Sequence, residues 1–247
     1  MKLLSWLAGG LLYLAFLAAT APASTLFWLA NRFAAAGITT SAASGTLWRG
    51  EARDVSFTPT GGKAIDLERL AWNIRPLGLA FGQLPVDIEF SGTEARGQGT
   101  LRLTPSGLDI TQLDATLPAV WLAHIQPRLE TFRLEGAISL RSKEFSLRQD
   151  HYQGQGEILW QQAAFGLSQV KPVGNYRGEI GGKGERIQLQ LQTQNGPLEL
   201  AGSGTWSKQS GIHFIGTAKA RERESELTPL LRLLGRPDPS GFYALKF

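Results

Sequence analysis

Side chains that could carry catalysis or bind a metal ion are few and scattered along the chain. The three histidines are His124, His151 and His213, and none stands at metal-ligand spacing from another histidine or a carboxylate. The absence of cysteine excludes thiolate zinc sites, cysteine nucleophiles and disulfides. The sequence therefore predicts no metal site and no catalytic residue.

Three short glycine-rich segments share only part of a known motif. Residues 178–184 and 61–63 contain Gly-Gly-Lys, but they lack the spacer before Gly-Lys and the Ser or Thr after the Lys that a phosphate-binding loop requires. Residues 202–204, Gly-Ser-Gly, lack the spacing of a nucleophile elbow. We interpret the first two as turns and the third as part of a strand, and we predict no bound cofactor and no enzymatic activity.

The composition argues against nucleic-acid binding and in favour of β structure. The 25 Lys and Arg residues exceed the 21 Asp and Glu residues by only four, and they are scattered rather than clustered. No nucleic-acid partner is therefore predicted. The 29 glycines are unfavourable in helix interiors but useful in turns and bulges, which favours a strand-built body.

The first part of the chain has the composition of a membrane segment. Residues 3–30 carry no charge and are flanked by Lys2 and Arg32. Because about 20 apolar residues can cross a bilayer as a helix, residues 3–30 predict a single membrane span. The Ala-Ala-Ala-Gly segment at 34–37 is expected to end this helix, with Gly37 as its C-terminal cap.

A cleaved signal peptide is the alternative interpretation of the same segment. Ala21-Pro22-Ala23 resembles a cleavage site, but the apolar run continues through residues 26–29, which favours an uncleaved anchor. We therefore expect residues 1–37 to form a short cytoplasmic start and a transmembrane anchor. Residues 38–247 are expected to form an exported β domain.

The body shows the two-residue period of β-strands. Residues 187–194 alternate apolar residues with glutamine or threonine, and Asn195-Gly196 then predicts a hairpin into residues 197–201. Similar runs separated by turn residues predict an antiparallel meander. The other predicted strands are 67–74, 86–91, 100–104, 108–117, 132–140, 155–161, 176–180, 212–218 and 243–247.

These elements predict a mainly β fold with a strongly curved antiparallel sheet, which an open trough, a sandwich or a partial barrel would satisfy. Two short helices interrupt it. The first is expected within residues 118–129, and the second is expected to begin with Thr228 as its cap and Pro229 at its first position, and to end at Gly235. The charged segment at 221–224 is interpreted as a solvated linker.

Tryptophan follows glycine at several places, in residues 45–50, 154–160 and 202–206. One interpretation is that the glycine permits a bulge or a sharp strand twist and the ring covers the space beside it. The other is that the rings line a groove for an extended apolar ligand or a partner strand. The candidate interaction residues are Trp48, Trp72, Trp160 and Trp206.

The order of these motifs resembles the type II secretion system protein N family, also called general secretion pathway protein N. The resemblance covers essentially the whole chain and implies no catalytic residues. It implies an inner-membrane protein with a periplasmic domain, whose partners are other subunits of the machine that moves folded proteins across the outer membrane. The segments that carry it are the N-terminal apolar run and residues 45–52, 70–79, 196–206, 230–235 and 241–245.

A fainter likeness links the strand pattern to AsmA-like periplasmic proteins, whose curved sheets form an apolar groove for lipid. The sequence thus supports two functions, a structural subunit of the secretion machinery and a lipid-binding or lipid-transfer protein. The first rests on the anchor and the family resemblance. The second rests on a sheet that is apolar on one face, which must either be buried or be exposed as a trough.

Overall fold

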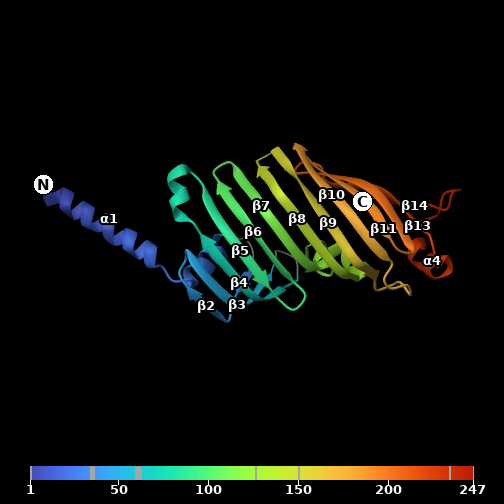
Figure 1. The fold of residues 1–247 in the computed structure, drawn as a ribbon, viewed down its shortest axis with the longest axis horizontal. Coiled ribbons are helices and arrows are strands. Elements are labelled where there is room, and N and C mark those ends of the chain that lie inside the picture. The colour runs from blue at the N-terminus through green and yellow to red at the C-terminus, as the bar shows by residue number, and fades with distance from the viewer. Residues whose placement is uncertain are drawn as a thin grey trace.

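The computed structural model describes residues 2–33, 37–58, 63–125, 127–149, 151–233 and 235–246. In these ranges, fourteen strands form one antiparallel sheet in which each strand from β3 onward pairs with the next in the chain (Figure 1). The predicted meander is therefore confirmed. The strands are β1 (Gly37–Thr39), β2 (Ala42–Gly45), β3 (Arg49–Thr58), β4 (Ile65–Ile74), β5 (Leu84–Ser91), β6 (Arg96–Thr104), β7 (Gly107–Pro118), β8 (Leu134–Arg148), β9 (His151–Phe165), β10 (Gly174–Gly184), β11 (Arg186–Asn195), β12 (Leu198–Ser207), β13 (Gly211–Ala220) and β14 (Tyr243–Lys246).

The register gives the sheet one apolar and one polar face, because residues directly opposite each other in an antiparallel pair point to the same side. One row across the strands is almost entirely apolar: Ile74, Val86, Leu101, Ile110, Phe145, Gly154, Gly182, Ile187 and Trp206. The row on the other side is polar apart from one glycine: Arg49, Asn73, Asp87, Thr100, Thr111, Glu144, Gln155, Gly181, Gln188, Thr205 and His213.

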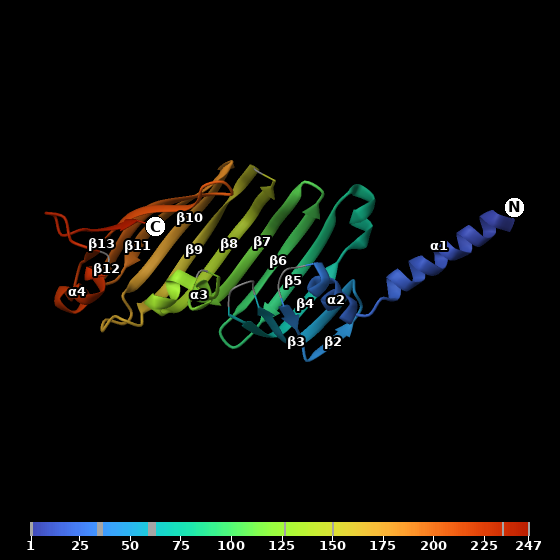
Figure 2. The ribbon, with the colours of Figure 1, turned by 180° about the vertical axis from the view of Figure 1, so that it is seen from behind.

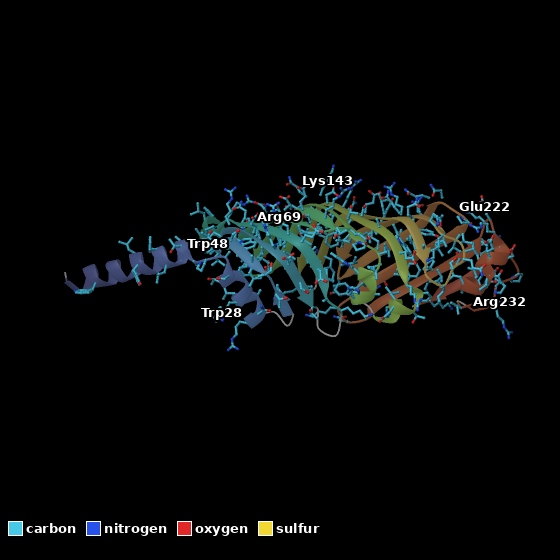
Figure 3. All side chains as sticks on the ribbon, turned by 90° about the horizontal axis from the view of Figure 1, so that it is seen from below. Trp28, Trp48, Arg69, Lys143, Glu222 and Arg232 are labelled. Carbon is cyan, nitrogen blue, oxygen red and sulfur yellow. The ribbon has the colours of Figure 1, made fainter. Side chains whose placement is uncertain are left out.

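Three short helices lie on the apolar face, near one end of the strands (Figure 2). They are α2 (Ser24–Phe33), α3 (Trp121–Ile125) and α4 (Glu224–Arg232). Phe27 of α2 and Leu230 of α4 are buried members of two separate clusters that these helices form with the sheet. The helix α3 lies beside the third cluster. Figure 3 shows Arg69 and Lys143 on the opposite, polar side from Trp28 of α2.

The sheet curls toward its apolar face in its C-terminal half. Tyr152 on β9 and Trp206 on β12 bring their ring centroids to 5.4 Å, although two strands lie between them. In a flat sheet those strands would be about 14 Å apart. On the intervening strand β10, Gly184 pairs with Tyr152, and Gly182 is in register with Trp206 through Ile187. A Cβ on Gly182 would come within 2.7 Å of the Gln153 nitrogen. Within the described residues the sheet remains open, with β1 and β2 at one side and β14 at the other, so it is neither a sandwich nor a closed barrel.

The N-terminal segment differs from the predicted continuous helix over residues 3–30. It forms α1 (Lys2–Thr20) and the separate α2, with a break at residues 21–23 that contains Pro22. Proline cannot donate the helical hydrogen bond, and Phe27 of α2 is buried against Trp72 instead of continuing the line of α1. None of the helices in the described ranges is both long and apolar enough to cross a membrane.

The helices of the body also differ in detail from the prediction. The first expected helix is the short α3 followed by a 3₁₀ turn, η2 (Pro127–Phe132). The second, α4, begins at Glu224, so Thr228 and Pro229 lie inside it rather than at its start. The charged segment 221–224, expected to be a linker, leads into this helix because Arg223 pairs with Glu226 in its first turn.

Several predictions concern ends of elements outside the described residues. These are the helix end at 34–36, the glycines of the 61–63 turn, the place of Leu234 in the second body helix, and the last residue of the final strand, Phe247. Residue Gly37, expected as a helix cap, is the first residue of β1. The Asn195-Gly196 hairpin is confirmed, because β11 and β12 pair directly across it.

Candidate functional site

The segment Gly45–Gly50 connects β2 to β3 and holds the N-terminal helices onto the sheet. The Leu47 amide donates to the Ala21 carbonyl at 2.8 Å, and the Ala23 amide donates to the Gly45 carbonyl at 3.2 Å. The indole Nε1 of Trp48 donates to the Ala18 carbonyl in the last turn of α1 at 2.7 Å. We call residues 18–23 and 45–50 together the helix–sheet junction.

Glycine is required at both ends of the connecting segment. Gly45 has a φ of 88°, and a Cβ there would come within 2.5 Å of the Arg49 carbonyl oxygen. A Cβ on Gly50 would come within 2.6 Å of Cζ2 of Trp72. The Gly-Thr-Leu-Trp-Arg-Gly motif is therefore explained by close packing at the junction.

Trp72 packs beneath the junction. Its side chain is buried, its Nε1 donates to the Leu47 carbonyl at 2.9 Å, and its ring meets that of Phe27 edge-on at 5.7 Å between centroids. A buried indole with a satisfied N–H contributes both apolar area and a fixed orientation. The structure thus brings Trp48 and Trp72 together around the Leu47 backbone.

The other two candidate tryptophans lie elsewhere. Trp160 on β9 donates from Nε1 to the Glu135 carbonyl at 3.0 Å and contacts the rings of Phe165 and Tyr176. Trp206 on β12 contacts Tyr152. The four rings therefore occupy three separate places, and the structure does not gather them into one groove.

The polar face carries ion pairs between neighbouring strands. Arg177 on β10 pairs with Glu157 on β9 at 2.7 Å, and Arg75, just after β4, pairs with Asp87 on β5 at 2.8 Å. A broad open hollow of about 1870 Å³ lies over β7 to β11 on this face. Cross-strand pairs of opposite charge favour one register, so these side chains form an ordered polar surface.

Asp109 is the most deeply buried carboxylate among the residues described. It is 5% exposed, accepts a hydrogen bond from the Ser146 hydroxyl at 2.7 Å, and pairs with Arg148 at 3.0 Å. The hydrogen bond from Ser146 lowers the pKa of Asp109, and Arg148 adds to this effect, while burial opposes it. All three groups lie at one end of β7 and β8, where the contacts fix the pairing of the two strands.

The histidines lie on three separate elements, His124 in α3, His151 in β9 and His213 in β13. In the part of the chain that the structure describes, no three histidine, aspartate or glutamate side chains come together in the manner of a metal site. Among the described residues, the three histidines are therefore too far apart in the fold to act together at one site.

Sequence reasoning did not single out the 3₁₀ turn η1 (Pro76–Phe81) between β4 and β5. Its large apolar side chains are strongly exposed, at 85% for Leu77, 57% for Leu79 and 82% for Phe81. The signal was present in the sequence, as an apolar run directly after Arg75-Pro76, in a position where a connection between strands is normally polar.

One family model matches most of the chain. The family model described as type II secretion system (T2SS), protein N, matches residues 36–246. No curated protein and no solved structure matches the chain significantly. The matched range contains all the strands of the sheet, together with the Gly45–Gly50 segment and the turn η1.

Proposed function

The chain belongs to the type II secretion system protein N family, and from this premise we propose that it is a non-enzymatic subunit of the secretion machinery. In this proposal α1 anchors the protein in the inner membrane and the sheet lies in the periplasm. There it supports the export of folded proteins across the outer membrane by binding other subunits. The observation that carries the proposal is the helix–sheet junction, which joins an apolar helix to a large open sheet through direct hydrogen bonds.

The surface of α1 supports membrane attachment. Trp6, Leu12 and Phe16 are 81%, 70% and 63% exposed, and the helix extends away from the sheet (Figures 1 and 2). Exposed apolar area costs roughly 25 cal/mol per Å² in water, so a helix of this composition favours an apolar environment. Trp6 near the start of α1 suits the membrane–water interface.

The junction supports a structural role for this anchor. Trp48 bonds the Ala18 carbonyl in the last turn of α1, and Leu47 bonds the Ala21 carbonyl directly after it. These two hydrogen bonds orient the helix where it leaves the sheet. A subunit that must present a surface to neighbouring proteins at a fixed height above a membrane needs such a connection. A flexible linker would not provide it.

The topology can be tested with single cysteines, because the natural chain has none. We expect Lys143→Cys, on the polar face, to react with a membrane-impermeant maleimide in cells whose outer membrane alone has been permeabilised. Labelling of Lys143→Cys only after the inner membrane is also broken would place the sheet in the cytoplasm and refute the proposal. The cysteine-free chain is the control for background labelling.

The partner proteins can be tested by purification of the full chain. We expect the tagged chain, solubilised from envelopes in mild detergent, to retain at least one other type II secretion subunit. The same preparation from cells that lack those subunits serves as the control. Recovery of the chain alone from envelopes with an intact secretion machine would contradict the proposed assembly.

The apolar face favours lipid binding as a second candidate function. Ile88, Leu101, Leu108 and Ile110 are partly buried on β5 to β7, and among the described residues they belong to none of the three buried clusters. Leu103 beside them is 46% exposed. Mass spectrometry of the purified chain should then detect co-purifying phospholipid, and this should be lost in the variant Leu101→Asp. A lipid-free preparation would remove this candidate.

A further inference from the structure

The turn η1 exposes more apolar surface than a loop in water normally does. Leu77 and Phe81 are 85% and 82% exposed and Leu79 is 57% exposed, all within a single 3₁₀ turn. Scattered exposed apolar residues are ordinary on protein surfaces, whereas a group of large ones on one loop marks a binding surface. The partner must therefore be apolar where it meets this turn.

The turn is also closed by its own backbone hydrogen bonds. The Gly78 amide donates to the Arg75 carbonyl at 3.2 Å, the Gly82 amide to the Leu79 carbonyl at 3.0 Å, and the Gln83 amide to the Gly78 carbonyl at 3.0 Å. Gly82 closes the turn in the left-handed conformation, with a φ of 68°. These bonds define the backbone conformation in which Leu77, Leu79 and Phe81 are exposed.

The position of η1 indicates what it meets. Trp48 holds α1 through its indole, which donates to the Ala18 carbonyl, and its own carbonyl accepts from the Ile74 amide at 2.6 Å. Ile74 stands two residues before Pro76, the first residue of η1. One residue therefore connects the last turn of α1 to the start of η1, and Figures 1 and 2 place the teal coil between β4 and β5 at the same end of the sheet as α1.

We propose that η1 inserts the side chains of Leu77, Leu79 and Phe81 into the periplasmic phospholipid leaflet that α1 enters. The inference rests on the proposed function, because it takes α1 to lie in the membrane. Arg75, directly before the turn, gives one guanidinium hydrogen bond to Asp87 and is still 54% exposed. Its remaining N–H groups are donors that a phosphate headgroup can accept from. Attachment at two points fixes the rotation of the sheet about the axis of α1, which a single helix does not do.

Single-cysteine variants of the full chain test this insertion directly. Leu77→Cys and Phe81→Cys would carry an environment-sensitive fluorophore, with Leu12→Cys on α1 and Lys143→Cys on the polar face as matched positions. The proteins are reconstituted in vesicles of phosphatidylethanolamine and phosphatidylglycerol that contain a phospholipid with a nitroxide near the headgroup. We expect blue-shifted emission and loss of fluorescence at positions 12, 77 and 81, and neither change at position 143.

The pattern of quenching separates the two proposals. Quenching at position 12 without quenching at 77 and 81 leaves α1 in the membrane and overturns the insertion of η1. The absence of quenching at all of these positions overturns membrane attachment itself, and the inference with it. Disulfide formation between unlabelled copies of Leu77→Cys, in vesicles of the same lipids with an added oxidant, combined with no quenching of the labelled variant, would show that a second copy covers the turn and would overturn the insertion.

Discussion

At the scale of single residues, Gly50 shows how tightly the helix–sheet junction is packed. A Cβ at this position would come within 2.6 Å of both the Ser44 carbonyl and the Trp72 ring, so that backbone or ring must move. Gly181 occupies the polar row of β10, and a Cβ there would meet nothing within 4 Å. Glycine is therefore needed for packing at position 50 but not at position 181.

We therefore expect Gly50→Ala to lower the free energy of unfolding by about 1–3 kcal/mol, the usual cost of overpacking. The matched variant Gly181→Ala should leave it unchanged or raise it slightly, because alanine reduces the freedom of the unfolded chain. Urea unfolding of the full chain in detergent measures both. Equal effects of the two substitutions would show that the packing around Gly50 is not as described.

The indole of Trp48 supplies a second test at this scale. Trp48→Phe keeps a ring but removes the 2.7 Å indole hydrogen bond to the Ala18 carbonyl, which keeps only the longer one from the Ala21 amide at 3.5 Å, at an expected cost of about 0.5–1.5 kcal/mol. Hydrogen exchange should then accelerate at the Leu47 amide, which donates to Ala21 in the same junction. Trp28→Phe is the control. Because Trp28 is 64% exposed on α2, this substitution should leave the exchange of the Leu47 amide unchanged.

Asp109 makes the stability of β7 and β8 sensitive to acid. Its pKa in the folded protein is lowered by the hydrogen bond from Ser146 and by Arg148, so its contribution to stability is complete above the unfolded pKa of about 4. That contribution is lost as the pH falls from this value through the lower folded pKa. The difference in unfolding free energy between the wild type and Asp109→Asn should shrink over that interval, and a difference independent of pH would contradict this account.

At the scale of elements, α4 closes the C-terminal end of the apolar face. Leu227, Leu230 and Leu231 are buried, and their spacing places them on one face of the helix. Their burial holds α4 on the sheet although Pro229 lies inside the helix. Leu230→Ala should cost about 2–5 kcal/mol of unfolding free energy. Leu233→Ala, at a position that is 59% exposed, should change it by less than about 0.5 kcal/mol.

The elements that the sequence predicted are those whose pattern is local. In β11, strict alternation and the following Asn-Gly turn fix strand, face and hairpin within one short segment. The strands β1 to β3 were not predicted individually, because their apolar positions are filled by small residues such as Ala52. The start of α4 was placed too late, because the Thr228-Pro229 signal is local whereas the burial of Leu227 depends on the sheet.

The candidate site was less predictable than the fold. The motif that contains Trp48 was evident from its residues, but its partner, the end of α1, lies far away in the sequence and was expected to continue as a straight helix. Phe27 is buried on the sheet only because Trp72 provides a surface for it, which no local pattern reveals. The apolar run of η1 is evident in the sequence, but the exposure of its side chains is not, because it depends on which parts of the sheet lie nearby.

At the scale of the whole molecule, an open two-faced sheet is joined at one end to an apolar helix. The three clusters under α2, α3 and α4 bury parts of the apolar face, whereas the polar face is ordered by cross-strand ion pairs and remains accessible (Figure 3). This arrangement suits a tethered subunit that presents a broad surface to neighbouring proteins. Its membership of the type II secretion system protein N family identifies the machinery in which those neighbours are to be sought.

The most direct test of this account is photo-crosslinking from the polar face in intact cells that carry the complete secretion machine. A photoreactive amino acid at Lys143, which lies on that face, should form an adduct that mass spectrometry identifies as another type II secretion subunit. The adduct should disappear in cells that lack that subunit. Crosslinks only to unrelated envelope proteins, or to none, from Lys143 and from the neighbouring polar-row residues Glu144 and Gln155 would contradict the central claim.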